Sequence, residues 1–135
     1  MVHTSKIIVD THIFIWDILG SSQLSDKMLS IMDDNQDNLY ISSITYWEVG
    51  MLVGKRRLTL NVPVDKFCKV GVRKRKYEVL DITPQIAQTV SQYANAINRD
   101  PADRIIAATT MVHNAILLTE DNNLKGFEFL KTSYP

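Results

Sequence analysis

Short runs of apolar residues, each three or four positions long, recur along the chain. Their density is typical of strands that are buried on both faces of a sheet, and the first of them ends abruptly at Asp10. A further run near the C-terminus would lie at the edge of such a sheet. The runs predict four strands and a fifth edge strand, at 7–9, 39–41, 79–82, 116–119 and 127–130.

The segments between these runs have the period of helices. Leu24, Met28, Ile31 and Met32 fall at i, i+4, i+7 and i+8, which is one face of a helix. Strands that alternate with helices predict an α/β fold with a parallel sheet and right-handed crossovers. The predicted helices cover 24–32, 46–53, 64–76, 84–97 and 101–112.

Length and composition indicate one ordered domain over 1–135. Of the 135 residues 45% are hydrophobic, and there are only 4 prolines and 5 glycines, so the chain can bury a substantial core. The single cysteine, Cys68, excludes an intramolecular disulfide and a cysteine-based zinc site, which favours a reducing compartment such as the cytoplasm. We recognise no signal peptide and no membrane-spanning run, so we expect no membrane partner.

Acidic residues follow two of the predicted strands. Asp10 comes directly after the first strand, and Asp121 lies two residues past Thr119 at the end of the fourth. Ligands of open parallel sheets bind beyond the carboxyl ends of the strands. Glu48 and Asp103 lie early in helices that face the same rim. Four such carboxylates would repel one another unless they held a cation such as Mg²⁺ or Mn²⁺, which suggests metal-dependent hydrolysis of nucleic acid.

Each of these acids also has a structural interpretation. Asp10 after a strand is often only the first residue of a loop, and a lone Glu48 on a helix is commonly a solvated charge. Asp100 stands before a proline as a natural helix N-cap, and Asp103 would then gain from the helix dipole at N3. Asp121 lies among residues that are common in turns. The pattern alone leaves these alternatives open.

Three blocks of sequence, at 7–16, 39–60 and 98–124, together resemble one known family. They contain a strand that ends in Asp-Thr-His, a helix with Ser-x-x-x-x-Trp-Glu, Asp-Pro-x-Asp-Arg at the start of a helix, and Thr-x-Asp after a strand. In this order and spacing they resemble PIN-domain ribonucleases, specifically the VapC-type toxins of bacterial type II toxin–antitoxin pairs. The likeness extends from residue 6 to about residue 130.

The resemblance assigns roles to the four acids. Asp10, Glu48, Asp103 and Asp121 match the family's metal-binding carboxylates. Asp10 and Asp103 would be the direct ligands of Mg²⁺ or Mn²⁺, whereas Glu48 and Asp121 would act through water or orient the attacking water. The resemblance thus implies a catalytic set of these four residues.

Other positions match the family's motifs with weaker implications. Asp100 matches a further acid of this branch. We keep the N-cap interpretation for it and rank it as a secondary site residue. Thr11 and Thr119 match small polar residues that line the site. Arg104 and Trp47 also match, but packing or a salt bridge explains them at least as well.

Residues just after the first strand are less informative. His12 neighbours the site and could contact substrate, although the catalytic set is complete without it and a local hydrogen bond is the simpler role. Phe14 and Trp16 would pack the first helix or form a dimer face.

Cys68 lies on the apolar stripe of the predicted helix 64–76. This position makes it a core residue rather than a nucleophile.

The resemblance implies a three-layer α/β/α PIN-like fold with a central parallel sheet of four to five strands. It further implies an endoribonuclease, a homodimer, and a cognate antitoxin that is VapB-like or another small DNA-binding protein. Two other functions remain open. One is a phosphoryl-transfer domain of the phosphatase or receiver type, since these also begin with a strand that ends in aspartate. The other is a catalytically inert PIN-fold binding module.

Charge is unevenly distributed along a chain whose net charge is zero. The balance of 15 basic and 15 acidic residues argues against a uniformly basic nucleic-acid coat protein. Residues 55–76, however, contain nine basic residues and one acid. This segment is either a solvated helix face or a band that holds an RNA backbone through phosphate contacts. The candidate RNA-binding residues are Lys55, Arg56, Arg57, Arg73, Lys74, Arg75 and Lys76.

Overall fold

A four-stranded parallel sheet lies at the centre of the computed structural model, which describes residues 5–96 and 100–125. The strands lie side by side in the order β3-β2-β1-β4. This confirms the predicted α/β fold with a parallel sheet, while the strand expected at 127–130 lies outside the described residues. The strands are β1 (Ile7–Val9), β2 (Leu39–Ser42), β3 (Glu78–Leu80) and β4 (Ile116–Leu118).

The central strand β1 is apolar throughout because both of its faces are covered. Ile7 and Val9 belong to one hydrophobic cluster and Ile8 to the other, and all three are buried. On its two edges β1 pairs in register with β2 and β4, with Ile8 opposite Tyr40 and Leu117. The chain passes from β1 outward to β3 and then returns to place β4 beside β1. The strand order therefore reverses between β1 and β4.

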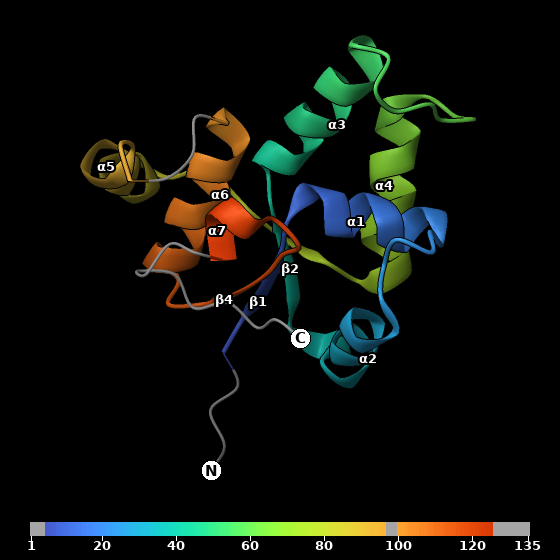
Figure 1. Ribbon diagram of the computed structural model, residues 1–135, viewed down its shortest axis with the longest axis horizontal. Helices are drawn as coiled ribbons and strands as arrows, with labels where there is room; N and C mark the ends of the chain where they lie inside the picture. Colours follow the sequence, from blue (N-terminus) through green and yellow to red (C-terminus); the bar gives the residue numbers. More distant parts are fainter. Residues whose placement is uncertain (1–4, 97–99, 126–135) are drawn as a thin grey trace.

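Helices cover both faces of the sheet (Figure 1). The larger cluster joins one face to α1, α2 and α4, and the smaller cluster joins the other face to α6 and α7. Helix α3 contributes to both clusters at the carboxyl edge of the strands, through Val49 and Ile44. The three-layer arrangement is thus confirmed. The helices are α1 (Thr11–Leu19), α2 (Asp26–Asp34), α3 (Ile44–Gly54), α4 (Val64–Arg75), α5 (Pro84–Tyr93), α6 (Pro101–Val112) and α7 (Asn122–Lys125), with a 3-10 turn at Gln36–Asn38.

Helix α1 was not predicted from the sequence. It begins directly after Asp10, and its residues Ile13, Phe14 and Ile15 are all buried. A helix that is enclosed on most sides lacks the alternating apolar and polar stripe that reveals a surface helix. Gly20, with φ of 62°, ends it in the left-handed conformation that glycine adopts readily.

A close approach between α1 and α4 depends on Gly71. A Cβ atom at this position would lie 2.0 Å from Cδ1 of Ile18 and 3.2 Å from Cζ of Phe14. Gly71 is buried, so the missing side chain is what lets the two helices touch. Helix α1 carries the first candidate acid at its start, and α4 therefore helps to position that acid.

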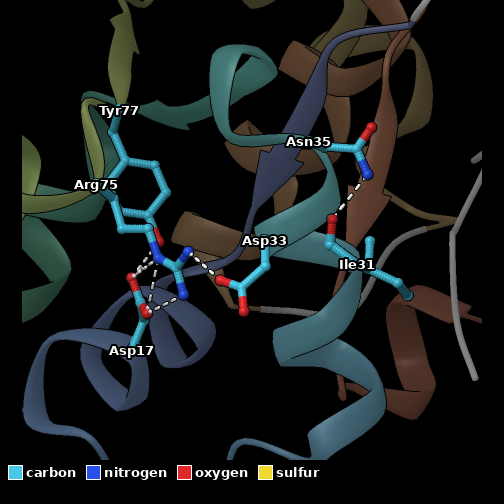
Figure 2. A network of polar contacts seen from close by, with 6 residues as sticks. All are labelled: Asp17, Ile31, Asp33, Asn35, Arg75 and Tyr77. Carbon is cyan, nitrogen blue, oxygen red and sulfur yellow. Dashed lines mark hydrogen bonds and ion pairs between the residues drawn. The ribbon is translucent and has the colours of Figure 1, made fainter.

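A polar network ties the far ends of the same helices together (Figure 2). Arg75 Nε lies 3.1 Å from both carboxylate oxygens of Asp17, and Arg75 Nη1 lies 2.7 Å from Asp33 on α2. The hydroxyl of Tyr77 donates to Asp17 at 2.8 Å. Burial and the negative charge of Asp17 raise the pKa of Tyr77, so the phenol keeps its proton. The guanidinium of Arg75 thus joins α1, α2 and the end of α4.

The described residues contain no helix that is both long enough and apolar enough to span a bilayer. Cys68 is a buried free thiol within the larger cluster, in agreement with the expectation that it is a core residue.

The contact at Gly71 yields a test of this packing. Gly71→Ala forces Ile18 out of its place, whereas Gly50→Ala on α3 meets no atom within 4 Å. Both variants gain the same helix propensity, so the difference between them isolates the steric cost. We expect Gly71→Ala to be less stable than Gly50→Ala by about 1–3 kcal/mol in urea unfolding. Equal stability would show that the Ile18 side chain moves aside at no cost.

Candidate active site

Asp10 lies at the carboxyl end of β1, where the strand order reverses. Its N–H donates to the Leu118 carbonyl at 3.1 Å, which extends the pairing with β4 by one residue. Its side chain caps α1, because Oδ1 accepts from the Ile13 N–H at 2.9 Å. Oδ2 accepts a hydrogen bond from the hydroxyl of Thr119. The carboxylate is only 5% exposed and is held on both oxygens.

Thr119 connects Asp10 to the fourth candidate acid. Its hydroxyl donates to Asp10 and accepts from the Asp121 N–H at 2.9 Å. Thr119 itself is fully buried. One hydroxyl therefore fixes the carboxylate at the end of β1 and the backbone of the loop after β4.

Glu48 reaches the same region from α3. It is 8% exposed, which rules out the solvated helix charge that the sequence left open. The hydroxyl of Thr11 forms a hydrogen bond with it and lies 3.1 Å from the hydroxyl of Thr45. Either hydroxyl is able to donate in the bond between Thr11 and Thr45. Thr45, which the sequence analysis did not select, thus supports the orientation of Glu48.

Burial and charge change the acidity of both carboxyl groups. Burial raises the pKa of Asp10 most, the hydrogen bond from Thr119 opposes this, and the charge of Asp121 adds to it. Burial also raises the pKa of Glu48, which is further raised by the charges of Asp100 and Asp10. The charge of His12 lowers both pKa values. These carboxylates are therefore close enough to repel one another.

The start of α6 brings two further acids toward α3. Asp100 is the N-cap, as expected, and accepts from the N–H groups of Ala102 at 2.9 Å and Asp103 at 3.3 Å. Its charge reaches Glu48, which places this end of α6 beside the site. Asp103 is half-buried in the first turn of α6. Asp103 thus shares the first turn of α6 with the cap formed by Asp100.

A divalent cation suits the chemistry of these groups, although the carboxylates do not stand in a ready-made cage. Among the described residues no three His, Cys, Asp or Glu side chains are grouped so that they could hold a metal ion as they lie. The donors are nonetheless carboxylate oxygens, the ligands that Mg²⁺ prefers. Two of them are buried with raised pKa values, and a cation would relieve their repulsion.

The candidate RNA-binding residues do not form one surface. Arg75 is occupied by Asp17 and Asp33, so it serves the fold and is not free to bind a phosphate. Lys74 and Lys76 line a hollow with Asp37 on the side of that network. The remaining candidates, Lys55, Arg56, Arg57 and Arg73, are exposed.

Comparison with known proteins identifies the family. The model of the PIN domain family matches residues 7–130. The chain belongs to the PIN domain family. This PIN domain is 28% identical over 122 residues to Ribonuclease VapC22 of Mycobacterium tuberculosis, covering 90% of this chain and 92% of that one. The phosphatase and receiver alternative loses its basis with this assignment.

Solved structures share the fold of this PIN domain. The crystal structure of VapBC2 from Rickettsia felis, bound to a DNA fragment from their promoter, has a chain with a TM-score of 0.71 and 16% identity, covering 94% of this chain and 96% of that chain. The DNA-bound VapBC of Salmonella typhimurium matches with a TM-score of 0.71 and 22% identity, covering 96% and 98%. FitAcB from Neisseria gonorrhoeae matches with a TM-score of 0.65 and 20% identity, covering 95% and 96%. These similarities establish the fold.

The raised pKa of Asp10 predicts how its replacement changes stability. The folded chain binds a proton at Asp10 more tightly than the unfolded chain, whose carboxyl keeps an ordinary pKa of 3.8. Stability from this group is full below that value and is lost as the pH rises through the folded pKa. Asp10→Asn removes the titration and keeps an N-cap. With a chelator present, the Tm of Asp10→Asn relative to the wild type should rise from about pH 4 to about pH 7.

The matched control is Asp81→Asn, in the exposed loop after β3. Its Tm relative to the wild type should not show that rise. A flat difference for Asp10→Asn would mean that burial does not destabilise the ionised Asp10.

Proposed function

We propose that the chain is a metal-dependent endoribonuclease that hydrolyses phosphodiester bonds in RNA, and that it is the toxin of a VapBC-type pair. The observation that carries this proposal is the approach of Asp10 and Glu48, two buried carboxylates from different elements, at the point where the strand order reverses. Membership of the PIN domain family and similarity to a protein named as a ribonuclease support it.

In this proposal Asp10 and Asp103 hold the ion directly, and Glu48 and Asp121 act through water. Bound Mg²⁺ or Mn²⁺ supplies a Lewis acid that polarises a phosphoryl oxygen and lowers the pKa of water. Asp10 needs no rearrangement to present an oxygen, because Ile13 and Thr119 already fix its rotamer. The protein forms no covalent intermediate.

Glu48 is suited to receive a proton from the attacking water. Its raised pKa makes it a better base than an exposed glutamate. Thr11 holds its side chain, and Thr45 holds Thr11 in turn. The two hydroxyls therefore orient the carboxylate without taking part in the chemistry. Asp100 remains chiefly a cap whose charge adds to the field at Glu48.

We also propose a protein partner and a dimer. Solved structures of the same fold include two VapBC assemblies and a toxin–antitoxin complex from Klebsiella pneumoniae. A cognate antitoxin, VapB-like or another small DNA-binding protein, would cover Asp10 and Glu48. A homodimer is also expected from the family. Analytical ultracentrifugation would test this expectation.

Replacement of the proposed ligands tests the activity. Asp10→Asn and Asp103→Asn should each lower Mn²⁺-dependent cleavage of a single-stranded RNA by about a hundredfold or more, because each removes a charged ligand. Calorimetric titration should show weakened Mn²⁺ binding in both variants. Asp81→Asn serves as control and should cut RNA as the wild type does.

Two outcomes would contradict this assignment. Wild-type cleavage by both ligand variants would remove Asp10 and Asp103 from the catalytic set. A wild-type protein that binds no Mn²⁺ at millimolar concentration and cuts no RNA would instead fit the inert binding module.

The exposed basic residues near the end of α4 give a second test. Arg73→Glu with Lys74→Glu reverses two exposed charges while leaving Arg75 in its ion pairs. RNA affinity should fall. The slope of log affinity against log salt should become shallower by about 0.7 per lost phosphate contact, and Mn²⁺ affinity should stay the same. Lys27→Glu on α2 reverses one exposed charge and serves as the control, with the effects compared per reversed charge. Unchanged RNA affinity would make these residues a solvated helix face.

A further inference from the structure

A hollow of about 330 Å³ begins next to the candidate active site and runs along α1. His12, Ile15, Trp16 and Leu19 line it, at the i, i+3, i+4 and i+7 positions of one helix face. His12 lies two residues from Asp10, whereas Leu19 is the last residue of α1. At 1.5 Å per residue this face is about 10 Å long, so the hollow leads away from the carboxylates.

The loop after α3 closes the other side of this hollow. Arg56 has φ of 59°, and this left-handed residue turns the chain back on the helix. The N–H groups of Arg57 and Leu58 then both reach the Leu52 carbonyl, at 2.8 and 3.2 Å. The turn places Leu52, Arg57 and Leu58 along the hollow, opposite α1.

The lining combines a flat apolar surface with one cation. The rings of His12 and Trp16 have centroids 5.9 Å apart and are tilted by 55°, so they do not stack face to face. Ile15, Leu52 and Leu58 supply apolar surface beside the indole. No carboxylate of the described residues forms an ion pair with Arg57, in contrast to Arg75. Gln23 adds polar groups toward the end of α1.

This combination matches the chemistry of a nucleotide. Bases of single-stranded nucleic acid stack on aromatic side chains, and an arginine forms charge-assisted hydrogen bonds to phosphate. The volume is in the lower part of the range of small-molecule sites, which suits one nucleotide. A polar side chain such as Gln23 is able to bond to the edge of a base.

We propose that this hollow is a nucleotide subsite, which holds one nucleotide of single-stranded RNA next to the phosphodiester that is cut at Asp10. Trp16 stacks on the base, Arg57 contacts its phosphate, and His12 lies between the subsite and the carboxylates. The inference rests on the proposed ribonuclease function. The charge of His12 acts on Asp10 and Glu48, so this end of the hollow lies near the carboxylates, and the exposed cation Arg57 favours RNA over an apolar protein segment as its occupant.

Tryptophan fluorescence tests the subsite directly. The chain has two tryptophans, so Trp47→Phe leaves Trp16 as the reporter. Combined with Asp10→Asn to prevent cleavage, this variant should show saturable quenching of Trp16 by a single-stranded hexaribonucleotide. Trp16→Phe with Asp10→Asn leaves exposed Trp47 as the matched reporter, and it should respond less. Quenching of Trp47 without quenching of Trp16 would overturn the proposal.

Steady-state kinetics with Mn²⁺ provides a second readout. Arg57→Ala should raise the KM of the hexaribonucleotide about tenfold and leave kcat within about twofold, because the contact is equal in the ground and transition states. Lys27→Ala, at an exposed position of α2, should change neither constant. An unchanged KM for Arg57→Ala would overturn the proposal.

The two proposals fail in different ways. A wild-type protein that cuts no RNA in Mn²⁺ disproves the ribonuclease function. A wild-type protein that cuts RNA, with Trp16 insensitive to the hexaribonucleotide, disproves only the subsite and leaves the hollow to a protein segment.

Discussion

The backbone hydrogen bond from the Asp10 N–H to the Leu118 carbonyl determines the geometry of the rest of the site. It continues the pairing of β1 and β4 past the last strand residue, which brings Asp10 against Thr119. Since α1 starts at the next residue, the same carboxylate must also cap a helix. Asp10 is thus held by the sheet, by the start of α1 and by the Thr119 hydroxyl. Glu48 therefore lies near a carboxylate whose position is fixed.

The parts of the fold that could be predicted are those whose burial leaves a local pattern. The strand that ends at Asp10 is recognisable because both of its faces are covered, and the caps at Thr83 and Asp100 are recognisable from the prolines that follow. Helix α1 was missed because enclosure removes its polar stripe. The edge residue Ile82, expected in a strand, lies beyond β3 and is 46% exposed.

The supporting contacts of the site were harder to predict because they join distant parts of the chain. Thr11 and Thr45 are 34 residues apart, and nothing local in either segment indicates that their hydroxyls meet. Arg75 looks like its basic neighbours in the sequence, yet a bidentate contact with Asp17, 58 residues away, sets it apart. Within one basic segment, Arg75 therefore forms ion pairs that stabilise the fold, whereas its neighbours Arg73 and Lys74 are exposed.

The cap on α1 constrains how this site is able to change over time. A small aliphatic residue in place of Asp10 would lose the bond to the Ile13 N–H and cost about 1 kcal/mol of stability. Asn, Ser or Thr at this position would keep the helix start while removing the charge. A relative that has lost catalytic activity is therefore expected to retain a polar residue at this position. A polar side chain at the end of β1 thus reflects the need to cap α1, and only a negative charge there indicates catalysis.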